Sequence, residues 1–301
     1  MILNPYIRKQ DGFPIVGPDL ARMWNCIVFS SSAPFTVSAM DGKKNWNGTV
    51  EYKNSDADWA VWDSTVTLNA PEGYLALRGI ANTGFAKKTD KTFVIQGENV
   101  RCDGNIQTLL DYAAVAAGTA STAGRYAFYG MFYSCTALIS APELPATTLG
   151  EDCYENMFYN CKSLLYPPAL PATTLAERCY ANMFRECHSL KTVPALPATT
   201  LAEDCYASMF RNCLSLKTVP MLPALTLPEW CYSDMFYNCQ ALKLSITQSS
   251  EYPYAYRIPT AGTGTSQSTS LCDMFDSTGG TFMGTPDINT TYYTALPPVT
   301  A

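Results

Sequence analysis

The phrase LPATTLAEDCYASMFRNCLSLK occupies residues 196–217 and returns through the middle of the chain with a period of 26 residues. A Met-Phe pair marks each copy, and the pairs begin at Met131, Met157, Met183, Met209 and Met235. A fixed period of this length is typical of stacked repeat proteins, because a single unit cannot bury its apolar face without a neighbour. We therefore expect a solenoid of five repeats over residues 125–245.

The pattern inside one repeat predicts a helix followed by a short extended segment. Thr200 precedes Glu203 by three residues, which is the spacing of a reciprocal helix cap. The apolar residues beyond this pair recur every four positions and predict one buried helical face. They are Leu201, Cys205, Met209 and Cys213. Residues 215–219 alternate in part and end at Pro220, which favours a strand. The fold class expected for this region is an α/β leucine-rich-repeat solenoid.

The chain has 12 cysteines, and nine of them stand in two columns of the repeat. On a helix Cys205 and Cys213 would lie about 12 Å apart, which exceeds the roughly 7 Å limit between the Cα atoms of a disulfide. We therefore expect free, buried thiols that act as small hydrophobic side chains. A zinc site is the alternative, but the sequence has no CxxC pair, so no metal is expected.

Residues 23–100 show short β-like runs separated by turn signals, and they predict a small β-sandwich module that precedes the repeats. The expected strands are Ile27 to Ser30, Phe35 to Met40, Thr49 to Tyr52, Trp59 to Trp62, Thr65 to Leu68, Tyr74 to Leu77 and Thr92 to Ile95. The tryptophans Trp46, Trp59 and Trp62 are assigned to the core and edges of this module, with a sugar-stacking platform as the alternative.

The remaining segments are expected to flank these two regions. Residues 1–22 form an N-terminal arm, and residues 101–124 form a linker with a capping helix from Asn105 to Ala117 that Gly118 ends. Residues 246–301 are predicted to hold a degenerate repeat around Leu271–Phe275, a C-terminal cap and an exposed tail from residue 295.

The charge balance argues against nucleic acid and anionic membranes as partners. The chain of 301 residues has 20 basic and 26 acidic side chains, a net charge of −6, without a block of lysine and arginine. The first residues lack the apolar region of a secretory signal, and the apolar run around residues 109–120 is too short to cross a membrane. We expect no membrane insertion.

No catalytic group is expected. The only histidine, His188, stands in a column that holds Thr136, Lys162, Leu214 and Gln240 in the other repeats, so the array does not support it as a base. The acidic pair Glu203-Asp204 is assigned to helix capping. Asp56, Asp58 and Asp63 lack the glycine and terminal glutamate of a calcium loop. No cofactor is expected.

Two variable columns are the candidate binding residues, because regular scaffolds with variable outward rows are how repeat proteins present binding surfaces. The first column is Tyr133, Tyr159, Arg185, Arg211 and Tyr237. The second contains Lys191, Lys217 and Lys243 after Ile139 and Leu165. The alternative for each column is an ordinary solvated exterior that varies without functional reason.

The phrase at residues 196–217, with its Cys-Tyr-x-x-Met-Phe core and LPATTL spacer, resembles the BspA-like leucine-rich repeats of gut bacteria and of their phages. The resemblance covers roughly residues 125–245. The stretch FTVSAMDGKKNWNGTVEY, at residues 35–52, is similar to a β module that often precedes such repeats in phage-encoded proteins. The resemblance implies adhesion or virion structure, and it brings no catalytic residues.

These expectations lead to a non-enzymatic phage virion protein, of the tail, baseplate or capsid surface, as the leading hypothesis. Its expected partners are other virion proteins, a bacterial surface glycan or protein, and further copies of itself. The apparent lack of a signal peptide and of an anchor favours assembly in the host cytoplasm over secretion. The alternatives are a bacterial surface adhesin, a ligand-free decoration protein and a carbohydrate-active enzyme.

Overall fold

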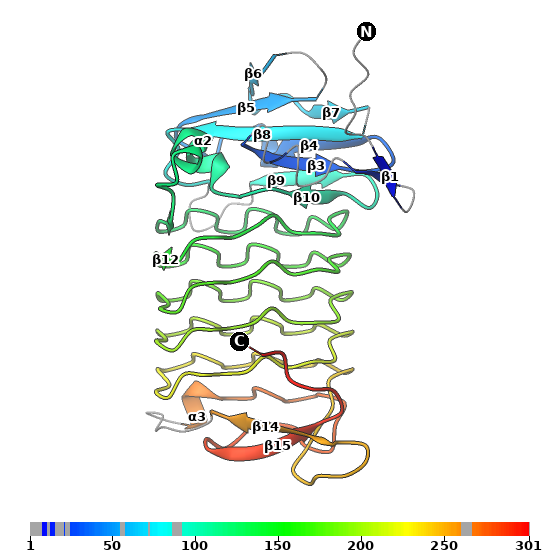
Figure 1. The fold of residues 1–301 in the computed structure, drawn as a ribbon, viewed down its shortest axis with the longest axis vertical. Helices are drawn as coiled ribbons and strands as arrows, with labels where there is room; N and C mark the ends of the chain where they lie inside the picture. Colours follow the sequence, from blue (N-terminus) through cyan, green and yellow to red (C-terminus); the bar gives the residue numbers. More distant parts are fainter. Residues whose placement is uncertain are drawn as a thin grey trace.

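The computed structural model describes residues 8–10, 13–15, 21, 25–54, 58–71, 73–85, 92–259 and 267–300. The two main sheets stand at one end, a stack of irregular rungs forms the middle, and a three-stranded sheet closes the other end (Figure 1). Most of the arm predicted at residues 1–22 lies outside the described residues, as does Asp56. The described part of the arm contains the antiparallel pair β1 (Arg8–Gln10) and β2 (Phe13–Ile15).

Two antiparallel sheets make up the N-terminal module. The larger has the order β10-β3-β8-β5-β6 and contains β3 (Ile27–Ser30), β5 (Thr49–Lys53), β6 (Ala60–Val61), β8 (Tyr74–Ile80) and β10 (Arg101–Asp103). The smaller has the order β7-β4-β9 and contains β4 (Phe35–Ala39), β7 (Leu68–Ala70) and β9 (Phe93–Gln96). A single 3-10 turn, η1 (Met40–Gly42), follows β4. Six of the seven predicted strands overlap an observed one closely. The seventh, expected at Thr65 to Leu68, begins only at Leu68, and β10 was not predicted.

The tryptophans of this module divide between core and surface. Trp46 and Trp62 are buried and stack with ring centroids 5.2 Å apart, which confirms their assignment to the core. Trp59 is half-buried and lies under the guanidinium of Arg78, 4.1 Å from it. Because Arg78 also pairs with Glu51 at 2.7 Å, this ring holds a salt bridge in place.

Helix α2 (Thr108–Ala116) confirms the helix expected before the repeats, and Gly118 follows it in the left-handed region at φ +70°. However, α2 lies against β8, where a Cβ on Gly79 would come within 1.6 Å of the Leu109 carbonyl oxygen. The first repeat is instead covered by backbone from the β module. Phe93 donates to the Met131 carbonyl at 3.1 Å, and Ile106 donates to the Glu143 carbonyl at 3.0 Å.

The repeats contain no helix, so the prediction of an α/β leucine-rich-repeat solenoid is wrong. Each rung is a run of turns in which two kinds of backbone hydrogen bond alternate. The amide of Met157 bonds back to Tyr154 at 3.2 Å, whereas the amide of Phe158 bonds to Met183 in the next rung at 3.0 Å. The short parallel pair β11 (Thr122–Ala123) and β12 (Thr148–Leu149) joins the backbone just before the first repeat to the end of that repeat.

Left-handed residues at every fourth position explain why no helix forms. In one repeat they are Asp204, Ser208 and Asn212, with φ angles of 55°, 53° and 62°. Each such residue breaks the right-handed backbone that a helix needs, and aspartate and asparagine tolerate this conformation better than most residues. The predicted Thr-Glu cap is likewise absent, since Thr200 lies in an isolated parallel bridge with Thr174.

The turns place side chains in pairs, two inward and then two outward. Cys205-Tyr206 and Met209-Phe210 are buried, whereas Ala207-Ser208 and Arg211-Asn212 are half-buried on the outer face. Equivalent buried rings stack from rung to rung, as Phe184 and Phe210 do at 5.6 Å between centroids. Such pairs stabilise by about 0.5–1.5 kcal/mol each beyond the burial of area. This column of rings forms the core of the stack.

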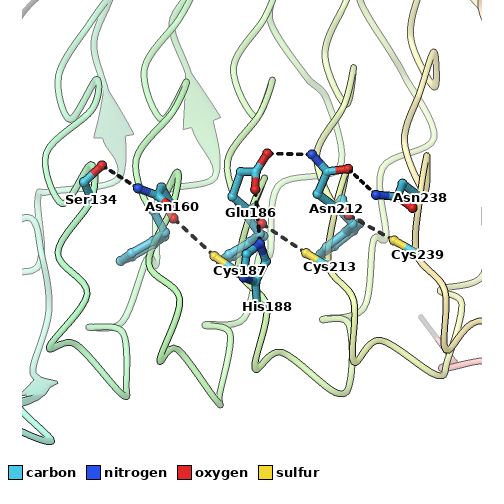
Figure 2. Close-up of polar contacts among 12 residues, drawn as sticks. Ser134, Asn160, Glu186, Cys187, His188, Asn212, Cys213, Asn238 and Cys239 are labelled. Atoms are coloured by element: carbon cyan, nitrogen blue, oxygen red, sulfur yellow. Dashed lines mark hydrogen bonds and ion pairs between the residues drawn. The ribbon is translucent and has the colours of Figure 1, made fainter.

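All twelve cysteines are free, and eleven of them are buried, which confirms the predicted burial of the repeat thiols. One column of thiols donates to carbonyl oxygens of the preceding rung. The sulfur atoms of Cys161, Cys187, Cys213 and Cys239 lie 3.0, 3.2, 3.1 and 3.1 Å from the carbonyl oxygens of Phe132, Phe158, Phe184 and Phe210. Figure 2 shows part of this thiol column.

At the predicted degenerate repeat, Phe275 stacks on Phe236 at 5.6 Å and the amide of Phe236 donates to the Met274 carbonyl. The helical turn α3 (Gln267–Ser270) precedes it. The closing sheet has the order β13-β15-β14 and contains β13 (Leu244–Ser245), β14 (Tyr254–Ile258) and β15 (Thr290–Thr294).

The tail from residue 295 was predicted to be exposed, but part of it lies against the stack. It runs back along the stack, and Val299 pairs in parallel with Pro220 of the fourth repeat (Figure 1). Among the described residues, no helix has both the length and the apolar character needed to cross a bilayer.

Candidate interaction surface

The outward pair after each Met-Phe forms the most continuous side-chain surface of the stack. Its first members are the predicted column Tyr133, Tyr159, Arg185, Arg211 and Tyr237, which we term the tyrosine–arginine row. All five are half-buried, because their stems lie against neighbouring rungs while one side stays open to solvent. The structure thus brings together the residues that the sequence proposed as one column.

Three of the four neighbouring pairs in this row contact each other face to face, and the pair Arg185 and Arg211 is the exception. The rings of Tyr133 and Tyr159 are nearly parallel, at 4°, with centroids 4.6 Å apart. The guanidinium of Arg185 lies 5.5 Å from the Tyr159 ring, and that of Arg211 lies 4.0 Å from the Tyr237 ring. These contacts hold long side chains in defined positions, which lowers the entropy that a ligand contact would have to remove.

The two arginines differ in their counter-charges. Arg211 pairs with the carboxylate of Asp234 at 2.7 Å, whereas Arg185 donates to the neutral amide oxygen of Asn182 at 3.3 Å. Among the described residues, Arg185 has no carboxylate oxygen within 4.0 Å. Burial raises the pKa of Asp234 above its ordinary value, although Arg211 opposes this shift. Arg211 is therefore held in an ion pair, whereas Arg185 is held by a neutral amide.

A second row runs beside the first and was not predicted. We term it the polar ladder, and it consists of Ser134, Asn160, Glu186, Asn212 and Asn238. Asn160 donates to Ser134 at 2.9 Å, Asn212 donates to Glu186, and Asn238 donates to Asn212 at 3.0 Å (Figure 2). The recurrence of asparagine at the same repeat position is the sequence signal that could have revealed this row.

Glu186 is the charged member of the polar ladder. Burial alone would raise the pKa of its carboxyl, but hydrogen bonds from Asn212 and His188 lower that pKa below its ordinary value. His188 lies at the outer edge of this cluster, with Nε2 at 3.1 Å from the carboxylate. Its side chain is half-exposed.

The lysine column forms a separate surface six residues further along each rung. Lys191, Lys217 and Lys243 are exposed, and the amide of Lys217 donates to the Lys191 carbonyl at 3.1 Å. Lys243 lies 3.4 Å from Glu251, whereas Lys191 and Lys217 have no carboxylate within 4.0 Å in the described part of the chain. The structure records no side-chain contact that joins these lysines to the tyrosine–arginine row.

Flat aromatic faces, guanidinium groups and ordered amides together can bind sugar rings and polar peptides. The aromatic faces supply apolar contact to one side of a ring, and the amides and guanidinium groups supply directed hydrogen bonds. The described residues contain no group of three or more His, Cys, Asp or Glu side chains placed to hold a metal ion. Comparison of the chain with protein-family models, curated proteins and solved structures found no match.

Proposed function

We propose that the protein is a non-enzymatic component of a bacteriophage particle, on its tail, baseplate or capsid surface. In this proposal, the repeat stack is displayed so that the tyrosine–arginine row contacts a glycan or protein of the bacterial surface. The N-terminal module attaches to other virion proteins. Several copies on one particle would convert weak single contacts into avidity.

One observation carries the adhesive part of this proposal. Five outward side chains on consecutive rungs present aromatic and cationic groups in a line, and stacking orders them in two groups, Tyr133-Tyr159-Arg185 and Arg211-Tyr237. The parallel polar ladder adds hydrogen-bonding groups along its side. The resemblance of the repeat phrase to BspA-like repeats supports the virion setting, because phages of gut bacteria encode such repeats.

The adhesive role is tested by reversing charge within the row. The double substitution Arg185→Glu and Arg211→Glu should weaken adsorption of particles, or of the purified protein, to host cells. The matched control is Lys191→Glu with Lys217→Glu, which makes the same change in net charge on the other column. If both pairs weaken adsorption equally, the effect is general electrostatics and the row is not the contact.

The virion setting is tested separately. Mass spectrometry of purified particles, followed by imaging with an antibody against the stack, should find the protein on the particle surface. Detection on bacterial cells without particles would favour the surface adhesin instead. Normal adsorption by particles that carry a chain without the stack would favour a decoration protein. Release of sugar from host polysaccharide would favour an enzyme.

A further inference from the structure

We propose that the edge of the fourth repeat at Val219–Met221 is a strand-docking site, and that copies of the protein associate by exchanging the segment that fills it. The segment is the tail, here residues 295–300. In the single chain the tail occupies its own site. In the associated form, the tail of a second copy makes the same contacts. This inference does not depend on the proposed function.

Backbone hydrogen bonds define the site. The amide of Val299 donates to the carbonyl oxygen of Val219 at 2.8 Å, and the amide of Met221 donates to the carbonyl oxygen of Val299 at 2.9 Å. The pairing is parallel and centred on Pro220, which has no amide hydrogen to offer. This is strand addition to a free edge, in which main-chain groups supply the affinity.

The edge at Val219–Met221 is free of a covering rung because the fifth repeat does not continue over it. Ile246 stands 26 residues after Pro220, where the next rung would cover it, but its side chain is 66% exposed. The chain has by then left the stack through β13, which pairs with β15. The tail therefore replaces a missing rung, and it shields an edge that would otherwise be open to pairing with another chain.

A single side chain anchors the tail. Val299 is half-buried and packs against the main core, whereas Leu296 is 40% exposed and Pro297 and Thr300 are exposed. The residues between β15 and Val299 thus form a connection with few contacts. Two consecutive prolines, Pro297 and Pro298, keep it extended, so it can reach away from its own copy.

Exchange of the tail between two copies changes the free energy little once the connection between β15 and Val299 has opened. A tail from a second copy forms the same two hydrogen bonds and buries the same valine, so the two states differ mainly in the connecting residues and in the entropy of association. Val299 supplies both hydrogen bonds and the buried side chain in either state.

Co-expression of two full-length copies with different affinity tags tests the exchange, because both tails are then available during folding. Capture of one tag should retain the other copy. The substitution Val299→Asp in both copies should reduce the retained copy by about tenfold or more, since tenfold corresponds to about 1.4 kcal/mol. Thr300→Asp is the matched control, because it places the same charge on an exposed neighbour, and it should retain the second copy.

A peptide probe tests the site directly. The full-length Val299→Asp chain, whose own tail no longer fits, should bind a fluorescent, end-capped peptide TALPPVTA and should not bind TALPPDTA. Peptide binding without retention of the second copy would overturn the exchange and leave the tail as a closure of its own chain. Retention that survives Val299→Asp would place the contact elsewhere. Failure of both assays would overturn the docking site as well.

Discussion

The sulfur of Cys213 lies 3.1 Å from the carbonyl oxygen of Phe184, to which it donates its hydrogen across two neighbouring rungs. The same oxygen accepts the backbone amide of Cys187 at 3.1 Å. A thiol therefore supplements a backbone bond that the stack already makes. The cysteine column contributes mainly as buried volume of the right size, with a weak directed contact in addition.

Replacing Cys213 tests this balance. Cys213→Ala should lower the free energy of unfolding by about 1 kcal/mol, because a small cavity forms and the Phe184 oxygen keeps its amide partner. Cys213→Ser should cost more, about 1–3 kcal/mol, because a buried hydroxyl needs a partner that its shorter bond places less well. Chemical denaturation of the three proteins measures both values. A serine variant as stable as the parent would contradict the apolar role.

Alkaline pH should destabilise the protein steeply. Burial raises the pKa of the Cys205 and Cys239 thiols from 9.0 to about 12. Because the folded-state pKa is the higher one, the stabilisation is complete below pH 9 and is lost as the pH rises from 9 toward 12. Each such thiol should lower the free energy of unfolding by on the order of 1 kcal/mol at pH 10. Thermal unfolding between pH 8 and pH 11 measures the loss.

The double variant Cys205→Ala with Cys239→Ala is the control for that pH dependence. It should be less stable at pH 8 because of the cavities, yet its stability should fall less steeply above pH 9, since two fewer thiols ionise on unfolding. An unchanged slope would assign the alkaline loss to other groups, such as the buried tyrosines.

One thiol per chain should be accessible to reagents in the folded state. Cys272 is half-exposed in the degenerate repeat, whereas the other eleven cysteines are buried. Burial and the nearby Asp273 raise the pKa of Cys272, so its reaction with an alkylating reagent should be slow near neutral pH and faster above pH 9. Mass spectrometry should find one modification per chain, absent from Cys272→Ser. Early modification of Cys205 would contradict the packing of the stack.

The repeat period and most N-terminal strands were predictable because both are written in local patterns of apolar residues. The helix was wrongly predicted because a four-residue period suits two structures. On a helix of 3.6 residues per turn, Cys205 and Cys213 would drift roughly 80° apart around the axis. The left-handed residues Asp204, Ser208 and Asn212 instead turn the backbone so that every fourth side chain faces the same side. The recurrence of Asp, Ser and Asn at these positions is the sequence signal that distinguishes the run of turns from a helix.

The candidate surface was predictable as a column but not as a set of contacts. Equivalent repeat positions must lie in line whatever the backbone does, so Tyr159 and Arg185 were grouped correctly. The polar ladder needed the actual turn geometry. The docking of Val299 on Pro220 joins residues far apart in the chain, and neither a period nor a local motif records such a pairing.

Glu186 offers a way to improve the stack. It has φ +65°, a conformation that costs glutamate about 1 kcal/mol more than asparagine, and asparagine already stands at the equivalent position in Asn160 and Asn212. Glu186→Asn should therefore raise the free energy of unfolding by about 0.5–1 kcal/mol, since it relieves the backbone and leaves an amide in the polar ladder. Chemical denaturation at pH 7 measures the change. Glu186→Gln is the control, because it supplies an amide without the preference for positive φ, and it should be no more stable than the parent. A glutamine variant that gained as much as the asparagine variant would show that removal of the charge, rather than relief of the backbone, produces the effect.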